Sequence, residues 1–239
     1  MKRLAGMFFC MLLLSVAGVQ GDVIRLTAIE DTYVDSMDTS GVFGNEELLN
    51  IQGTAPGMFS LGSIQQTFLK FELEGAIPEN AMITAAVFGI YYAGQQSGGF
   101  TTADPSAFLY YVSDDTWSED TLDWDAAQSL GSNPDPLTGD PYTLGDEDTA
   151  HEWDLFSGSG FNWTGWQVDL DDGYISFLMT VELEEVNNYA NFYSSEYGTA
   201  SMRPYLDITY TVVPEPTSMA LTLIGISSLA AIRKKSNNR

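Results

Sequence analysis

The sequence predicts an all-β fold, a two-sheet antiparallel β-sandwich of jelly-roll type, for the middle of a 239-residue chain. Several short segments alternate between apolar and polar residues, as strands with one buried face do. Stretches rich in Gly, Pro, Asn, Asp and Ser separate these segments. No segment between 22 and 212 keeps an apolar period of 3.6 residues over three turns, which an amphipathic helix would need. Many short strands joined by such turns are typical of a sandwich.

Four strands can be placed in order along the chain. The segment 67–73 puts its later apolar residues on one face and two charged residues on the other. The segment 83–92 is apolar on both faces, which suits a central strand. The segment 174–183 alternates more loosely, and 205–212 is a clean final strand. We see no internal repeat and no second core, so we expect one domain over 22–212.

The start of the chain, residues 1–21, is predicted to be a signal peptide. Lys2 and Arg3 precede a mostly apolar run, and a small-residue stretch then ends at Gly21. This order is that of a cleavable secretory signal, and the stretch is too short to span a bilayer comfortably. We therefore expect a signal helix, a mature start near Asp22 and export of the protein.

The other end of the chain, 213–239, closes with an apolar run and a basic cluster. Pro214, Glu215 and Pro216 stand just before the run 219–232, whose 14 residues are short for a membrane span. The basic residues after the run favour the cytoplasmic side of a membrane. This tail resembles the PEP-CTERM sorting signal. The resemblance implies a short hydrophobic helix, transfer to an exosortase, cleavage near the tripeptide and release to the cell surface or into extracellular polysaccharide. A plain tail anchor on a proline-rich stalk is the alternative.

The charge balance excludes nucleic acid as a partner. Of 33 acidic and 9 basic residues, only three bases lie between 22 and 213, namely Arg25, Lys70 and Arg203. So negative a surface repels phosphate backbones. It favours solubility in an extracellular or salty medium, or capture of Ca²⁺ by carboxylates. The single cysteine, Cys10, falls in the signal peptide, so we expect the mature domain to have no disulfide and no thiolate chemistry.

A set of short segments, in a fixed order, links the domain to a known family. They are Asp31-Thr32-Tyr33-Val34, Phe68-Leu69-Lys70-Phe71-Glu72-Leu73 with Ile77-Pro78, Ile83 to Tyr91, Trp117-Ser118-Glu119 with Trp124, Trp166-Gln167-Val168-Asp169, and Phe192 to Glu196 leading to Arg203-Pro204-Tyr205-Leu206. In this order they resemble DNRLRE-type modules, which are carbohydrate-binding β-sandwiches of secreted bacterial and archaeal proteins. The resemblance covers 22–212 and implies the sandwich fold and carbohydrate binding. Lys70 and Glu72 stand where that family usually has Arg and Asp.

The sequence contains no residue pattern that indicates an enzyme. Its one histidine, His151, lies in an acidic stretch without a placed Ser or Cys partner, so no catalytic triad is indicated. Glycoside hydrolysis needs two carboxylates about 5–10 Å apart across a cleft, and among so many acids some such pair carries no information. We therefore expect no catalysis and no catalytic residue, and keep a polysaccharide-active enzyme as an alternative.

The acid-dense stretches 114–125, 135–154 and 169–172 raise the question of a metal. None of them fits an EF-hand loop. Sandwich modules of this kind often hold a structural Ca²⁺ between loops, bound by carboxylates and carbonyls. We hypothesise one such Ca²⁺, with ligands from Glu30, Asp31 and Glu196; a solvated acidic face is the alternative. Arg203 could instead pair with Glu196.

The five tryptophans divide into two groups. Trp117, Trp124 and Trp166 match positions that are structural in the resembled family, so we expect them to be mostly buried. Trp153 and Trp163 are the candidates for carbohydrate binding, because an aromatic face can cover the apolar CH side of a sugar ring. Trp163 lies in a Gly-rich stretch that is expected to be a loop.

The sequence thus predicts an exported cell-surface or extracellular-matrix protein that binds polysaccharide without catalysis. A structural or adhesive matrix component without a defined ligand is the alternative from another class. Because the domain has only three basic residues, a neutral glycan, or a polyanion bridged by Ca²⁺, is the favoured ligand. The expected further partners are the export machinery and exosortase, with membrane contact through the tail until it is processed.

Overall fold

A computed structural model describes residues 21–53, 63–78, 80–94, 105–130, 137, 142–156, 169–181 and 189–212. Its elements are β1 (Asp22–Thr27), β2 (Glu30–Asp35), β3 (Leu48–Gln52), β4 (Gln65–Glu72), β5 (Ala81–Gly94), β6 (Ser106–Val112), α1 (Trp124–Ala127), β7 (Tyr142–Thr143), β8 (Thr149–Asp154), β9 (Tyr174–Val181), β10 (Tyr189–Tyr193), a 3₁₀ turn (Ala200–Met202) and β11 (Tyr205–Val212).

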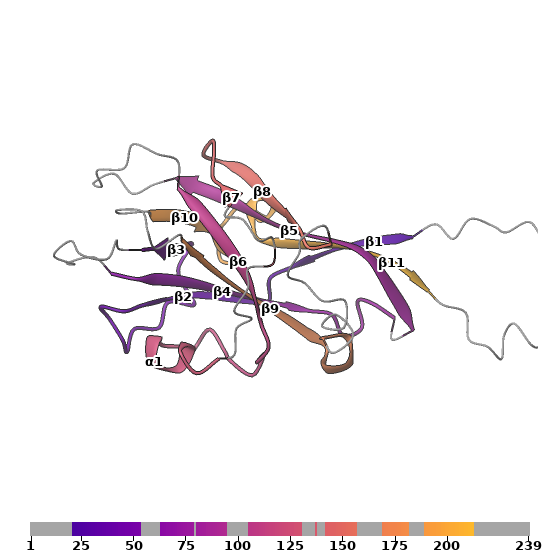
Figure 1. Ribbon diagram of the computed structural model, residues 1–239, viewed down its shortest axis with the longest axis horizontal. Coiled ribbons are helices and arrows are strands. Elements are labelled where there is room, and N and C mark those ends of the chain that lie inside the picture. The colour runs from indigo at the N-terminus through magenta and orange to yellow at the C-terminus, as the bar shows by residue number, and fades with distance from the viewer. Residues whose placement is uncertain are drawn as a thin grey trace, which may run out of the picture.

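All of these strands belong to one curled antiparallel sheet, in the order β1-β11-β5-β10-β3-β4-β9-β6-β7, with β2 added to β4 and β8 added to β5. In Figure 1, β2, β4 and β9 lie below β5, β8 and β10, so the curled sheet forms two layers. This arrangement confirms the predicted all-β fold and is consistent with a sandwich. The four strands expected from the sequence are present as β4, β5, β9 and β11.

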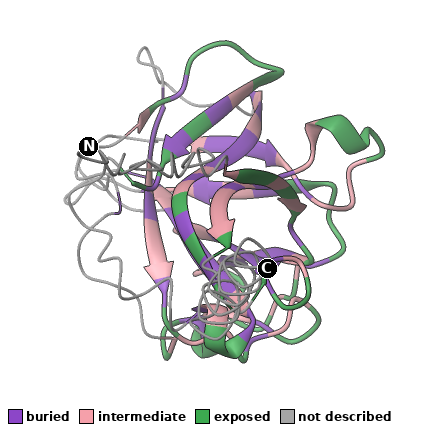
Figure 2. Ribbon diagram, turned by 90° about the vertical axis from the view of Figure 1, so that its right-hand side faces the viewer, coloured by how far each residue is buried: buried purple, intermediate pink, exposed green. Residues whose placement is uncertain are grey.

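The main core lies between the two layers and is centred on aromatic side chains. Phe71 of β4 and Phe177 of β9 contact Phe88 of β5, with ring centroids 6.1 and 5.5 Å away. These side chains are buried because alternate residues of each strand point inward. Figure 2 shows this as buried and more exposed segments that alternate along the strands. The contacts hold strands from both layers together.

The outer face of the β2-β4-β9-β6 layer carries a second, smaller core. The segment 113–130, which contains α1, covers part of this face with Trp117, Leu122 and Ala127. Beneath it lie Phe68 and Leu178 from the strands. Asp123 caps α1, since its carboxylate accepts a hydrogen bond of 2.8 Å from the amide of Ala126. We call 113–130 the covering segment.

The covering segment explains why β4 is buried on both faces. Its burial is continuous from Thr67 to Phe71, although the sequence alternates. Lys70, which was expected on the face away from the main core, is only 5% exposed. Its ammonium pairs with Glu30 at 2.6 Å and contacts the carbonyl of Trp117. A charged side chain can be buried here because an opposite charge and an acceptor meet it.

Several predictions concern residues outside the described part of the chain. These are the signal peptide with its helix, the tail 213–239 with its hydrophobic helix and with Pro214, Glu215 and Pro216, and the tryptophans Trp163 and Trp166. Among the described residues, no helix has the length and apolar character needed to cross a bilayer.

Candidate functional site

A groove lies on the outer face of β4, β6 and β9, beside the covering segment. It has a volume of about 220 Å³ and is lined by Gln52, Ile64, Gln65, Gln66, Tyr110, Leu178, Thr180 and Val181. Tyr110 and Leu178 also border the smaller core. Gln128 of the covering segment approaches Gln66, with its amide nitrogen 3.5 Å from the Gln66 oxygen. The groove therefore begins where the covering segment ends.

The lining of the groove combines an aromatic ring, amides and a hydroxyl. Tyr110 of β6 is directly opposite Leu178 of β9 in the strand register. Its pKa is raised by burial, and a hydrogen bond with the Thr180 side chain opposes this shift. Gln65 donates a hydrogen bond of 2.8 Å to Asp35, whereas its amide oxygen is buried without a partner. An aromatic ring beside amide and hydroxyl groups can contact both the apolar and the hydroxyl-bearing parts of a sugar.

The structure corrects the prediction that Trp153 binds a ligand. Its side chain is 1% exposed, in the main core. The indole packs against Phe88 and Tyr142, with centroids 5.6 and 4.8 Å away. His151 and Trp153 of β8 and Leu155 just after it are all buried, and that alternation in the sequence was the signal for burial. Trp153 is a core residue and offers no face to a glycan.

The expected structural tryptophans agree with the described structure where they can be compared. Trp117 is 5% exposed, and its indole donates a hydrogen bond of 3.1 Å to the hydroxyl of Ser176. Trp124, at the start of α1, is partly buried against the smaller core. Both residues attach the covering segment to the sheet.

Two of the three predicted metal ligands come together in the structure. Asp31 is 1% exposed and lies beside Glu196, close enough for the charge of Glu196 to raise its pKa. One oxygen of each carboxylate is buried without a partner. Glu119, which the sequence analysis did not single out as a ligand, joins them: it accepts a hydrogen bond of 2.9 Å from the amide of Asp31. We call Asp31, Glu119 and Glu196 the loop carboxylates.

The third predicted ligand, Glu30, is directed elsewhere. Its carboxylate is held by the Lys70 ammonium at 2.6 Å. Arg203 also differs from the expectation, because its guanidinium donates to the carbonyl of Tyr197 at 2.9 Å. The structure therefore brings Asp31 and Glu196 together with Glu119, whereas Glu30 pairs with Lys70.

Burial is the main reason that the pKa of Asp31 is well above its usual range, and the neighbouring Glu196 adds to it. The amide of Ser195, which donates a hydrogen bond of 2.8 Å to Asp31, opposes the shift. Two carboxylates in contact repel each other unless a proton or a cation lies between them. The geometry of the loop carboxylates fits a shared proton or a bound cation.

His151 is placed for packing rather than for proton transfer. It is 6% exposed, between the rings of Tyr92 and Tyr142, whose centroids lie 5.9 and 5.5 Å away. Burial lowers its pKa. Its nearest hydroxyl belongs to Thr149, 3.3 Å from the imidazole. A neutral, enclosed imidazole of this kind stabilises the core.

Comparison with known proteins identifies one family. The model of carbohydrate-binding module family 96 matches residues 22–154. No curated protein matches the chain. The matched region runs from β1 to the end of β8 and includes Gln52, Gln65, Gln66 and Tyr110 of the groove, whereas the groove residues of β9 follow it.

Proposed function

Because the chain belongs to carbohydrate-binding module family 96, we propose that it is an exported protein that binds polysaccharide without catalysis. We place its binding site in the groove on β4, β6 and β9. The observation that carries this placement is the lining, where a partly buried ring stands beside amide and hydroxyl side chains on a concave surface. Such a combination orients a ligand with many hydroxyl groups.

The side chains of the groove have distinct tasks in this proposal. The Tyr110 ring covers the apolar CH side of one sugar residue. The amide of Gln66 and the hydroxyl of Thr180 bind hydroxyl groups at its rim. Gln65 is fixed by its hydrogen bond to Asp35, so it holds the start of β4 in position at the groove. Strand residues suit this task because the sheet keeps them in position before the glycan arrives.

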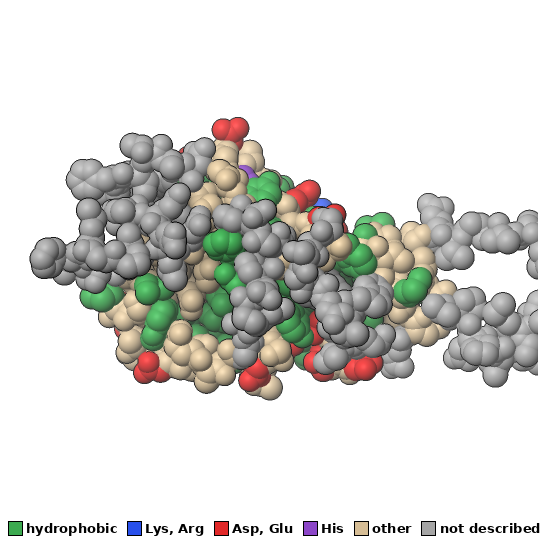
Figure 3. Space-filling model, viewed as in Figure 1, with side chains coloured by type: hydrophobic (Ala, Val, Ile, Leu, Met, Phe, Trp, Pro, Cys, Tyr) green, Lys and Arg blue, Asp and Glu red, His purple; other side chains and the backbone are tan. Residues whose placement is uncertain are grey.

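The ligand that fits best is a neutral glycan. The chain carries 33 acidic residues against 9 basic ones. The face in Figure 3 shows acidic side chains around its edge and little that is basic. None of the eight groove residues is basic, so a polyanionic glycan would bind only through a bridging cation.

One structural Ca²⁺ at the loop carboxylates is part of the proposal. The buried, unpartnered oxygens of Asp31 and Glu196 support it, because a buried carboxylate oxygen requires a proton, a donor or a cation. Glu119 would supply a further ligand, and Glu30 remains with Lys70. The ion would connect the start of β2 to the end of β10.

Export and placement at the cell surface rest on the two ends of the chain. The predicted signal peptide, the resemblance of the tail to a PEP-CTERM signal and the resemblance of the domain to DNRLRE-type modules support a protein that is exported and passed to an exosortase, with release to the surface or matrix. A structural or adhesive matrix component without a defined ligand is the second candidate, favoured by the acidic composition.

A glycan array tests the proposal, with the purified full-length chain in Ca²⁺ and again in a chelator. We expect saturable binding to a neutral glycan, and loss of that binding in Tyr110→Ala. Tyr210→Ala is the matched control, because Tyr210 is also a partly buried strand tyrosine packed on a core. Absence of binding to every glycan would favour the structural matrix component, and equal loss in both variants would contradict the groove. Turnover that disappears on replacing one carboxylate would identify an enzyme.

A further inference from the structure

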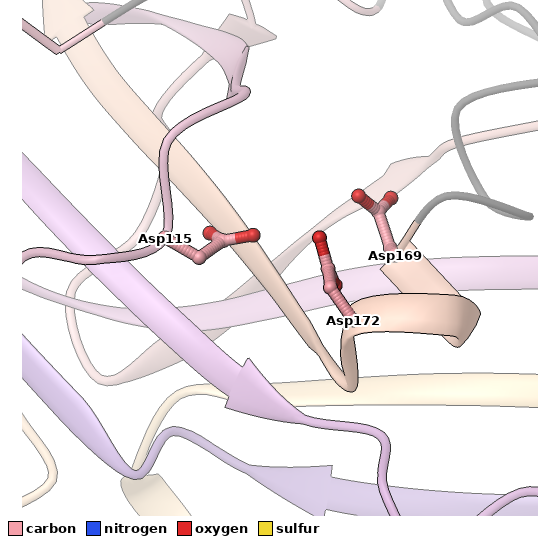
Figure 4. Close-up of side chains that lie close together, drawn as sticks. All are labelled: Asp115, Asp169 and Asp172. Carbon is pink, nitrogen blue, oxygen red and sulfur yellow. The ribbon is translucent and has the colours of Figure 1, made fainter.

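Three aspartates outside the groove and the loop carboxylates meet at one end of the β6–β9 ladder. Asp115 follows β6, whereas Asp169 and Asp172 belong to the turn before β9. One carboxylate oxygen from each lies within 4.8 Å of the other two. Figure 4 shows the side chains converging from these two segments on a common space. We call them the aspartate triplet.

The carboxylates of the triplet lack enough donors to neutralise them. Asp169 is fully buried, and only one of its oxygens has a partner, the hydroxyl of Tyr111. Its other oxygen is buried without a partner. Both oxygens of Asp115 are buried and lack a hydrogen bond of good geometry, although the Ser176 hydroxyl is close enough to lower the pKa of Asp115. Asp172 accepts one hydrogen bond of 3.2 Å from the amide of Tyr174. Buried acceptors are almost always satisfied in proteins, so these atoms require a proton, a hydrogen-bond donor or a cation.

The pKa values of the triplet carboxylates are also consistent with a bound cation. Burial raises the pKa of Asp169 to about 8; the Tyr111 hydrogen bond opposes this, and the charges of Asp115 and Asp172 add to it. Burial also raises the pKa of Asp115, where Ser176 and Lys70 favour the charged form only in part. A cation in the common space would attract all three carboxylates at once.

The spacing is compatible with Ca²⁺. This ion binds oxygens at about 2.3–2.6 Å, so one ion can join oxygens up to about 5 Å apart. The 4.8 Å limit on the triplet oxygens is therefore within the reach of Ca²⁺. The donors are all oxygens, which suits this ion and disfavours softer metals.

We propose that Asp115, Asp169 and Asp172 bind a Ca²⁺ ion that ties the loop after β6 to the turn before β9. Val112 and Ser176 are the last pair of the β6–β9 ladder on this side, so the ion would close the ladder where its hydrogen bonds end. Asp169 supplies the buried ligand, and Asp172, which is exposed, leaves a side open for water. This site is separate from the proposed glycan groove and from the loop carboxylates.

Calcium titration of the full-length chain by calorimetry tests the proposal, with Asp172→Asn as the variant. Asp172 is exposed, so this substitution leaves the core intact. Asp171→Asn is the matched control, because it removes the same charge from the same turn. We expect wild type and Asp171→Asn to bind one more Ca²⁺ than Asp172→Asn. The Kd of this additional ion should be about 10⁻⁴–10⁻³ M, as in extracellular calcium-binding modules.

Terbium luminescence gives a second readout, since Tyr111 contacts the triplet and can sensitise a bound Tb³⁺. In wild type we expect added Ca²⁺ to displace Tb³⁺ and abolish its luminescence. In Asp172→Asn we expect the Tb³⁺ luminescence to be at least tenfold weaker. The same number of bound ions in Asp172→Asn and Asp171→Asn would overturn the site, as would a wild type that binds neither ion. Glycan binding in these variants reports separately on the groove.

Discussion

Lys70 lies 2.6 Å from Glu30, and this ion pair connects β4 to β2 beneath the covering segment. The Lys70 side chain is 7% exposed and that of Glu30 is 27% exposed, so one charge is buried and the other reaches water. The ammonium also lies 4.5 Å from the centre of the Trp117 ring. The pair thus supports the inner side of the segment that borders the groove.

Lys70→Ala should destabilise the domain by about 2–3 kcal/mol, less than the ~3–5 kcal/mol of a fully buried broken pair, because Glu30 can be partly hydrated. Urea unfolding of wild type, Lys70→Ala, Glu30→Ala and the double variant measures this as a double-mutant cycle. A coupling energy near zero would contradict a stabilising pair.

Thr180→Val should weaken binding of a neutral glycan by about fivefold to thirtyfold, because the lost hydroxyl is worth roughly 1–2 kcal/mol when its partner stays buried. Thr84→Val is the matched control on β5, where the hydroxyl contacts the carbonyl of Thr209 at 3.2 Å. Calorimetric titration with the glycan found on the array measures both. Equal affinities for the two variants would remove Thr180 from the site.

Trp153→Ala should cost about 3–5 kcal/mol of stability, as expected for truncation of a large core side chain. Trp153→Phe should cost less and leave glycan affinity unchanged, since the indole nitrogen has no hydrogen-bond partner to lose. Thermal unfolding and glycan titration together check both statements. A selective loss of glycan binding in Trp153→Phe would restore the earlier assignment of this residue to the site.

Removing Ca²⁺ should lower the stability of the domain. An ion at about ten times its Kd stabilises the folded state by about 1.4 kcal/mol, and this contribution disappears in chelator. Asp172→Asn should keep the part of this effect that comes from the loop carboxylates, and Glu196→Gln the part from the triplet. Melting temperatures in Ca²⁺ and in chelator separate the two sites, and temperatures that do not change in wild type would exclude both.

Acidification should destabilise the fold through His151. Burial lowers the pKa of the folded imidazole below its usual value of about 6.5, opposed by the backbone and charge of Asp146. The unfolded chain therefore binds the proton first, so this contribution is present above pH ~6.5 and is lost as pH falls toward the folded pKa. His151→Gln should flatten this part of the stability curve. Because His151 is the only histidine, a proton NMR titration reports its pKa directly, and a value above about 6.5 would contradict the prediction.

The strands could be predicted from the sequence because their pattern is local. Alternation in β4 and β11 and continuous apolar character in β5 arise from how a pleated strand meets a core, and a segment shows this without its partners. The same signal extends to β8, where His151 and Trp153 alternate with polar residues. The prediction that Trp153 binds a glycan rested on its aromatic chemistry instead, whereas its position opposite Phe88 in β5 makes it a core residue.

The sites could be predicted only in part, because their residues are distant in the chain. Asp31 and Glu196 were named together from a family resemblance, and the amide of Ser195, 164 positions away from Asp31, holds them in place. Glu119 and the aspartate triplet lie in the acid-dense stretches 114–125 and 169–172, but acids are common throughout this chain, so the sequence did not show which of them meet.

The sequence by itself determined the all-β class, the acidic character and the strands, because propensity, charge and alternation are properties of single segments. The tertiary structure decided which strand face is covered and which is open. Gln66, Phe68 and Lys70 share one face of β4, yet the covering segment buries Phe68 and Lys70, whereas Gln66 meets only Gln128 at the edge of that segment and lines the groove. That difference depends on where residues 113–130 fold back onto the sheet, and contacts between distant segments set that position.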